Sequence, residues 1–172
     1  LEYELVDAIG EALEAGRYFD VVIEYAKAGE EDLLCRITAH NRGPDAAPLH
    51  LLPHLWFRNT WSWDEGAEKP LLEATGDREV CLTHADLGTR WWYADAPDGT
   101  EIELLFTENE TNHERLFGTP NPSPYVKDGI NDAVVHGDPE AVNPDRRGTK
   151  VAAHVRTTVP AGASRTVQIR FT

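Results

Sequence analysis

The sequence contains no methionine, and it begins at Leu1. Because a complete cytoplasmic translation product normally begins with methionine, we expect the chain to be one part of a longer protein. A domain taken from a longer enzyme need carry no chemistry of its own. The catalytic groups of the parent protein can therefore lie outside these 172 residues.

Long hydrophobic runs are also absent. No run approaches the roughly 20 apolar residues that cross a bilayer, and the N-terminus lacks the pattern of a signal peptide. The net charge is −14, from 30 acidic and 16 basic residues, which argues against binding to nucleic acid or to an anionic membrane surface. We therefore expect a cytoplasmic protein with neither of these partners.

Cysteine and serine are scarce. The two cysteines, Cys35 and Cys81, lie in strand-like runs, which favours small buried hydrophobic residues over a disulfide, although one bridge remains an alternative. The three serines form no Gly-x-Ser-x-Gly nucleophile motif, and no glycine-rich loop leads into a helix to hold phosphate. We expect no cofactor.

The chain has seven histidines, which makes a metal site the next hypothesis. His50 and His54 are four residues apart on a predicted strand, so both should project from the same face. No third ligand follows at metal spacing, and neither an HExxH nor a paired CxxC motif occurs. We favour histidine rings that are hydrogen-bonded within an aromatic strand, and we expect no metal.

Alternating hydrophobicity is the strongest structural pattern that is present. Residues 2–14 fit a strand or a short helix equally well. Residues 17–25 predict a half-buried strand. A second strand is predicted over residues 33–40. The inward positions of the first strand are Phe19, Val21, Ile23 and Tyr25. Those of the second strand are Leu33, Cys35, Ile37 and Ala39.

The next segments are strand-like as well. Residues 48–61 are apolar on both faces, which predicts a central strand covered on two sides, with a bulge or an edge at Pro53. Turn signals such as Asp98-Gly99 separate short strands, with no amphipathic helix between them. This pattern predicts an all-β protein, an antiparallel β-sandwich.

The chain is predicted to end in a β-hairpin formed by residues 150–159 and 165–171. Their apolar positions alternate in step, so the two strands should share one inward face. These positions are Val151, Ala153, Val155 and Val159 on the first strand, and Val167, Ile169 and Phe171 on the second.

Residues 107–148 interrupt the alternation, with Asn, Pro, Gly and Asp throughout. Such a long irregular segment is uncommon within a compact domain and is usually functional or disordered. Its apolar content argues against disorder, and we expect it to pack against a domain outside this chain and to be poorly ordered without it. The apolar residues are Leu116, Phe117, Tyr125, Val126, Ile130, Val134 and Val135.

Carboxylates and tryptophans offer two further hypotheses. Glycosidases need two carboxylates at a defined separation, and the 107–148 segment offers Glu108, Glu110, Asp128 and Asp132. With 30 acidic residues such pairs are expected by chance, so we favour solvated or turn-capping roles. Exposed aromatic rings can stack on sugars. Trp61 and Trp63, at a strand end, fit that role better than Trp56 and Phe57, which suit a core.

Four stretches resemble a known family: residues 49–63 (LHLLPHLWFRNTWSW), 104–118 (LLFTENETNHERLFG), 124–137 (PYVKDGINDAVVHG) and 141–162 (AVNPDRRGTKVAAHVRTTVPAG). The chain resembles, over almost its whole length, the N-terminal β-sandwich of bacterial proteins in glycoside hydrolase family 63, the family of processing α-glucosidase I. The resemblance implies a supersandwich followed by an (α/α)6 barrel. It also implies inverting hydrolysis of α-glucosidic or related bonds.

In that family the two catalytic carboxylates belong to the barrel, so no catalytic residue is carried over. The resemblance implies a non-catalytic accessory domain that packs on a missing C-terminal catalytic domain and shapes its active-site rim. One alternative is an autonomous carbohydrate-binding module that uses Trp61, Trp63 or the Trp91-Trp92 pair, and another is a structural sandwich that mediates only oligomer contacts. The residues that we expect to face the barrel or bind carbohydrate are Trp61, Trp63, Tyr125, Lys127, Asp128, Asn131 and Asp132. The polar members can instead bond groups of their own loop.

Overall fold

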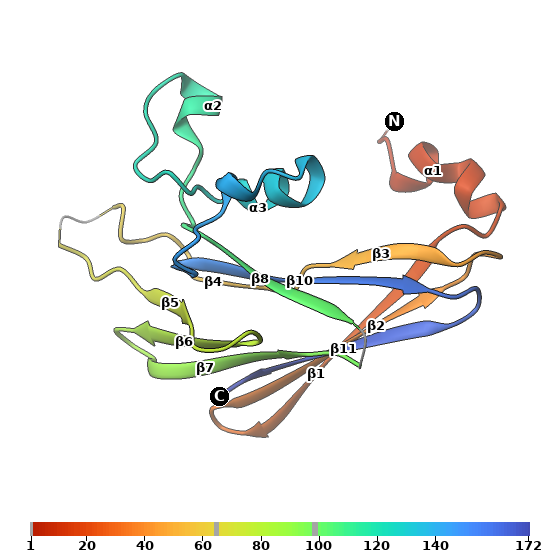
Figure 1. Ribbon diagram of the computed structural model, residues 1–172, viewed down its shortest axis with the longest axis horizontal. Helices are drawn as coiled ribbons and strands as arrows, with labels where there is room; N and C mark the ends of the chain where they lie inside the picture. The colour runs from red at the N-terminus through yellow and green to blue at the C-terminus, as the bar shows by residue number, and fades with distance from the viewer. Residues whose placement is uncertain (1, 64–65, 98–99) are drawn as a thin grey trace.

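Two antiparallel sheets pack face to face in the computed structural model, which describes residues 2–63, 66–97 and 100–172 (Figure 1). This arrangement confirms the predicted all-β sandwich, whereas the predicted turn at Asp98-Gly99 lies outside the described residues. The seven-stranded sheet has the spatial order β1 (Phe19–Gly29), β2 (Asp32–Asn41), β11 (Ser164–Phe171), β7 (Gly88–Asp95), β6 (Glu79–His84), β5 (Leu71–Ala74) and β9 (Arg147–Gly148).

The second sheet is smaller and is centred on β10 (Lys150–Val159). Along one side of β10 lie β3 (Ala47–Leu51) and then β4 (His54–Trp56). Along the other side lies β8 (Glu101–Thr107). The helices are α1 (Leu5–Glu14), α2 (His113–Phe117), α3 (Gly129–Asn131), the π-helical turn η1 (Asp132–His136) and the 3-10 turn η2 (Pro139–Ala141).

Of the two possibilities for the N-terminal residues, the structure has the helix. The backbone N–H of Glu4 donates to the Asp7 carboxylate at 2.9 Å, and the two residues form a reciprocal capping box at the start of α1. Such a box satisfies amide groups that a helix N-terminus otherwise leaves unpaired. Across the described residues, every helix is too short or too polar to span a membrane.

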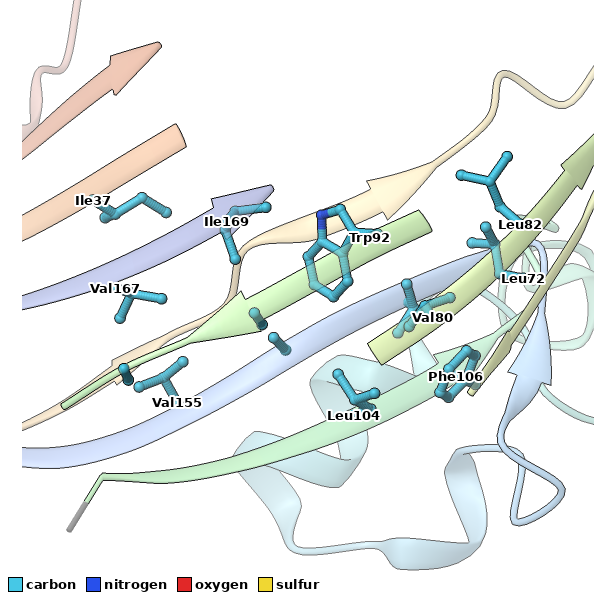
Figure 2. Close-up of a cluster of buried hydrophobic side chains, with 14 residues drawn as sticks. Ile37, Leu72, Val80, Leu82, Trp92, Leu104, Phe106, Val155, Val167 and Ile169 are labelled. Carbon is cyan, nitrogen blue, oxygen red and sulfur yellow. The ribbon is translucent and has the colours of Figure 1, made fainter. Parts of the chain in front are cut away.

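The core lies between the sheets and draws on both of them (Figure 2). Alternation predicted the inward face of β2 correctly at Ile37 and Ala39, which are buried, but Leu33, predicted on the same face, is 41% exposed. Cys35 packs against the same core, and both cysteines are free thiols. The larger sheet contributes Leu72, Val80, Leu82, Trp92, Val167 and Ile169, and the smaller sheet contributes Leu104, Phe106, Val151 and Val155.

The predicted strand at residues 17–25 forms as part of β1, but the prediction that it is half-buried is wrong. Val21, Ile23 and Tyr25 point toward the sandwich interior, yet their exposed fractions are 47%, 53% and 78%. The reason is that β1 forms the outer edge of the larger sheet, where the smaller sheet does not cover it. Alternation identifies the residues that share a face of a strand, but it does not show whether another layer covers that face.

The prediction of a central strand over residues 48–61 is also wrong. β3 and β4 both pair with β10 and form one edge of the smaller sheet, interrupted at Leu52 and Pro53. The expected irregularity at Pro53 is correct. Proline lacks an N–H group and is confined to edges and bulges, and here its carbonyl accepts a hydrogen bond from the Ala153 N–H at 3.0 Å.

The C-terminal hairpin does not form. β10 belongs to the smaller sheet, whereas β11 pairs with β2 and β7 in the larger one. The connection at residues 160–163 therefore carries the chain from one sheet to the other. The alternating apolar residues of the two strands meet across the core instead of side by side, so Val155 and Val167 belong to one cluster.

Most of the 107–148 segment lies on the outer face of the smaller sheet (Figure 1), and its last two residues form β9 of the larger sheet. Val126 and Ile130 are buried, and Ile130 packs with Leu105 and Ala152 of that sheet. The expectation of a partner outside the chain is therefore wrong for these two residues. It remains a prediction for Leu116, Phe117 and Val135, whose exposed fractions are 62%, 67% and 65%.

Candidate functional site

Glu110 joins two distant segments of the chain at one end of the sandwich. Its carboxylate accepts hydrogen bonds from Asn59 Nδ2 at 2.7 Å and from Trp61 Nε1 at 2.8 Å. Its backbone carbonyl accepts from the N–H of Lys127 at 3.0 Å. We call Asn59, Trp61, Glu110 and Lys127 the Glu110 cluster. It holds the segment after β4 against the 107–148 segment.

Asn109 connects this cluster to the sheet beneath it. Its side-chain amide donates to the Phe57 carbonyl at 2.7 Å, and its backbone N–H donates to Thr149 Oγ1 at 2.7 Å. Its own carbonyl accepts a hydrogen bond from Asn59 Nδ2 at 3.1 Å. The start of the 107–148 segment is therefore bonded to residues beside both β4 and β10, which limits the freedom of the loop that carries Glu110.

Asp128 lies next to the cluster and organises α2. Its carboxylate accepts from Asn112 Nδ2 at 3.1 Å and from Arg115 Nη1 at 3.2 Å. The side-chain oxygen of Asn112 in turn accepts from the backbone N–H of Arg115 at 3.0 Å, which caps the helix. These bonds match the alternative interpretation for Asp128, in which a loop acid binds groups of its own segment.

The predicted site residues fall into three groups. Trp61 and Lys127 belong to the Glu110 cluster, and Asp128 adjoins it. Asn131 and Asp132 lie apart, on α3 and η1, where Asn131 Nδ2 donates to Asp132 Oδ1 at 3.4 Å.

The third group, Trp63 and Tyr125, lies two residues along the chain from Trp61 and Lys127 respectively. Trp63 is 63% exposed, and the Arg58 guanidinium lies 5.0 Å from the centre of its ring, a cation–π arrangement. The carbonyl of Tyr125 accepts from the Glu108 N–H at 2.8 Å. Trp63 is therefore the predicted residue whose ring is most open to a partner.

The candidate acids are engaged by donors of this chain. Glu108 accepts a hydrogen bond from Thr149 Oγ1 at 2.7 Å and forms an ion pair with Lys69 Nζ at 3.0 Å. Glu110 binds Asn59 and Trp61, and Asp132 lies 4.0 Å from the His136 ring. These contacts give the carboxylates positioning roles, and we assign none of them to catalysis.

Lys150 is a member of this surface that the sequence reasoning missed. Its ammonium donates to the Lys127 carbonyl at 3.2 Å. Burial, and then the charge of Lys127, lower the pKa of Lys150, while burial and Lys150 lower the pKa of His54. Lys150 is the first residue of a strand whose alternating pattern draws attention to its buried positions. Its place beside the Glu110 cluster follows only from the pairing of Lys150 with Trp56 of β4. Asn59 was also missed, although an asparagine between aromatic residues at a strand end was a sequence signal for a polar contact there.

His50 and His154 form a second polar centre on the outer face of the smaller sheet. His154 Nε2 and His50 Nδ1 lie 2.9 Å apart, and His154 is only 4% exposed. Burial, then His50 and Arg156, lower the pKa of His154, and the carboxylates of Glu103 and Glu101 oppose this shift. Within the described residues no group of three or more His, Cys, Asp and Glu could hold a metal ion, so a hydrogen-bonded histidine pair accounts for this geometry.

The lowered pKa values of the histidines predict that the free energy of unfolding is smaller in acid. The pKa of His154 is lowered in the folded state, so as the pH falls below about 6.5 the unfolded chain binds protons first. The free energy of unfolding should therefore fall between pH 7.5 and pH 5.5, as measured by urea denaturation. The variant His154→Gln should show a shallower pH dependence, with a residual slope from His54. An unchanged slope in that variant would contradict the assignment.

The chain has a relative among known proteins. No family model matches the chain. The uncharacterized protein YMR196W of Saccharomyces cerevisiae is 37% identical over 182 aligned residues, which cover 90% of this chain and 17% of the yeast protein. The chain thus spans less than a fifth of the length of the curated relative that it matches.

Proposed function

We propose that this chain is a non-catalytic domain of a larger inverting α-glucosidase-like glycoside hydrolase, which packs on a helical catalytic barrel and shapes its active-site rim. The observation that carries the proposal is the convergence of three stretches that resemble glycoside hydrolase family 63, residues 49–63, 104–118 and 124–137. Trp61, Glu110 and Lys127, one from each stretch, meet in the Glu110 cluster.

Exposed apolar side chains at the same end of the sandwich support this proposal. The segment after β4 and α2 both lie there (Figure 1). Trp56, Trp63, Leu116 and Phe117 are each more than half exposed, so the expectation of a core position is wrong for Trp56. Clustered exposed apolar groups are typical of surfaces that meet another protein unit. The yeast relative adds support, because 17% of its length matches this chain and the remainder has room for a catalytic unit.

The proposal is tested by disrupting this surface in the longer protein. Serine replaces both Leu116 and Phe117 in the full encoded protein and, separately, in the isolated chain. Because both side chains are exposed, the isolated chain should keep its melting temperature. In the full protein the change should lower the turnover of α-glucosides several-fold and increase proteolysis between the domains. The control is Leu87→Ser, at a partly exposed leucine in the turn between β6 and β7.

Two outcomes would count against the proposal. Turnover of any α-glucoside by the pure, isolated chain would place catalytic groups within it. Saturable quenching of tryptophan fluorescence by maltooligosaccharides, lost in Trp63→Ala, would favour the alternative of an autonomous carbohydrate-binding module. The exposed Trp63 ring is the specific feature on which that alternative depends.

A further inference from the structure

β1 forms a free edge of the larger sheet, because among the described strands it pairs with β2 alone. Its register with β2 is regular from Phe19 to Lys27, and a bulge follows between Lys27 and Gly29. Figure 1 shows β1 at the bottom of the view and α2 at the top. A free strand edge is a template for pairing with another strand, so the groups along β1 decide which strand can pair with it.

The hydrogen bonds at the end of β2 show which backbone groups of β1 face outward. The N–H of Arg42 donates to the Tyr18 carbonyl at 2.9 Å, so this pair is bonded across the two strands. The N–H of Asn41 instead donates to the Ala163 carbonyl, on the side of β11, at 2.9 Å. Phe19 lies opposite Asn41, and its N–H and C=O groups therefore point away from β2. Alternation gives the other odd-numbered residues up to 27 this orientation.

The middle of this edge is open and apolar. Among the described residues, none hydrogen-bonds to the outward backbone groups of Val21, Ile23 and Tyr25. Their exposed side chains line an apolar groove of about 540 Å³, to which both sheets contribute. Proteins commonly protect such an edge with proline, an inward-pointing charge or a bulge. In β1 the charge of Lys27 and the bulge lie at one end only, so residues 19–26 stay unprotected.

The acids of β1 lie on the opposite face of the strand and limit the partners that it can accept. Glu24 forms an ion pair with Arg36 at 2.9 Å, and Asp20 forms one with Arg42 at 2.6 Å. All four side chains are about half exposed, and such surface pairs are weak. A further acid directly opposite Asp20 or Glu24 would therefore destabilise a pairing.

β1 is self-complementary in one antiparallel register. A twofold axis through Ile23 places this residue opposite Ile23 of the partner subunit. Val21 then lies opposite Tyr25 of the partner subunit, and Phe19 lies opposite Lys27 of the partner subunit. The regular part of the strand, 19–27, is paired from end to end, because Ile23 is its midpoint. Every outward N–H or C=O group of one copy thus meets an outward group of the other.

The charges select the same register. With the axis through Ile23, Glu24 lies opposite Val22 of the partner subunit, and Asp20 lies opposite Ala26 of the partner subunit. With the axis through Val22, Asp20 would lie opposite Glu24 of the partner subunit. With the axis through Glu24, two glutamates would lie opposite each other. An unrelated strand places no such constraint on β1, so the agreement between strand length and charge favours a second copy as the occupant.

We propose that two copies of this chain associate through their β1 strands and join their larger sheets into one continuous antiparallel sheet. The association stops at a dimer, because the same edge serves both copies. It also brings the two apolar grooves together, since Val21 packs beside Tyr25 of the partner subunit on the groove side. This surface is separate from Leu116 and Phe117, so the association does not depend on contact with a catalytic barrel.

Net charge and interface size set the strength of the dimer. Each copy carries a net charge of −14, so the copies repel each other until salt screens their charges, over about 10 Å at 0.1 M. A single pair of strands also forms an interface at the low end of the size range of specific complexes, about 1,200 Å² or less. We expect a weak dimer that becomes stronger as the salt concentration rises.

Sedimentation velocity of the 172-residue chain measures the association. Between about 10 µM and 500 µM protein at about 0.3 M salt, the mass should move from monomer toward dimer and no further. Over the same range, amide exchange followed by NMR should slow several-fold at Val21, Ile23 and Tyr25. The amides of Val22 and Glu24 face β2 and should change little.

Substitutions at the exposed Val22 test the register. Val22→Lys places a lysine opposite Glu24 of the partner subunit and should tighten the dimer several-fold. Val22→Glu places acid opposite acid and should weaken it several-fold. The matched controls are Leu87→Lys and Leu87→Glu, which change the net charge equally at an exposed turn between β6 and β7. These controls should have much smaller effects.

A backbone variant tests the edge itself. Ile23→Pro removes the outward N–H group at the twofold axis and leaves the bonds to β2 intact, because proline is tolerated at an edge where its nitrogen faces solvent. The variant should fold and remain monomeric. If it fails to fold, the comparison of the Val22 and Leu87 variants still decides the question.

Three results would overturn the proposal. One is a chain that stays monomeric at the highest concentration and salt. Another is an association that leaves the amides of Val21, Ile23 and Tyr25 unprotected, because a different surface would then join the copies. The last is an equal effect of the matched substitutions at Val22 and Leu87, since only net charge and not the register through Ile23 would then govern the dimer.

Discussion

Replacing Phe106 with alanine is expected to lower the free energy of unfolding by about 3–5 kcal/mol. Phe106 is fully buried and is the largest such side chain among the described residues. It packs in the core near Val80 of the larger sheet (Figure 2) and lies opposite Val151 of β10. Removing the ring leaves a cavity that the close-packed sheets cannot fill. Since many domains are stable by only about 5–15 kcal/mol, the variant should unfold at a much lower denaturant concentration.

Urea denaturation followed by tryptophan fluorescence measures this effect. The matched control is Leu71→Ala, also on a strand but 41% exposed, for which a much smaller loss is expected. Because the Phe106 carbonyl accepts from Asn143, the Phe106 variant should also loosen the end of the 107–148 segment. Equal losses in the two variants would mean that Phe106 is not central to the core.

Replacing Gly129 with alanine is expected to displace the 107–148 segment from the smaller sheet. A methyl group at this position would overlap the carbonyl oxygen of Ala141, a backbone atom that cannot rotate away. Such overpacking costs about 1–3 kcal/mol or more. The next residue, Ile130, packs on Leu105 and Ala152, so a shift of α3 would expose this apolar contact. The amides of residues 126–142 should therefore exchange faster with solvent.

Hydrogen exchange is the suitable measurement, because the core between the sheets need not unfold. Gly10→Ala serves as the control: Gly10 lies in α1, and an added methyl group would meet no atom within 4 Å. Gly10 directly follows a kink in α1 at Ile9, so alanine there should change the exchange of the 107–148 segment little. If Gly129→Ala leaves exchange in the 107–148 segment unchanged, then the packing of α3 against η2 does not hold this segment in place.

Part of the site could be predicted from the sequence. The density of turn residues identified 107–148 as the irregular segment, and Trp61 and Lys127 were among the residues selected. The central role of Glu110 was not predictable, because its partners Asn59 and Trp61 lie far away in the chain. Hydrogen bonds over such distances depend on how the sheets place β4 and β8, and no local pattern contains that information.

The sequence by itself determined the fold class and the inward face of β2, because strand alternation depends only on the order of apolar and polar residues. It could not determine sheet membership. β10 and β11 carry matching apolar patterns, which fit a hairpin and a crossing between sheets equally well. The tertiary structure decided that they face each other across the core. It also decided that β1 lies uncovered at an edge, since coverage depends on the relative widths of the two sheets.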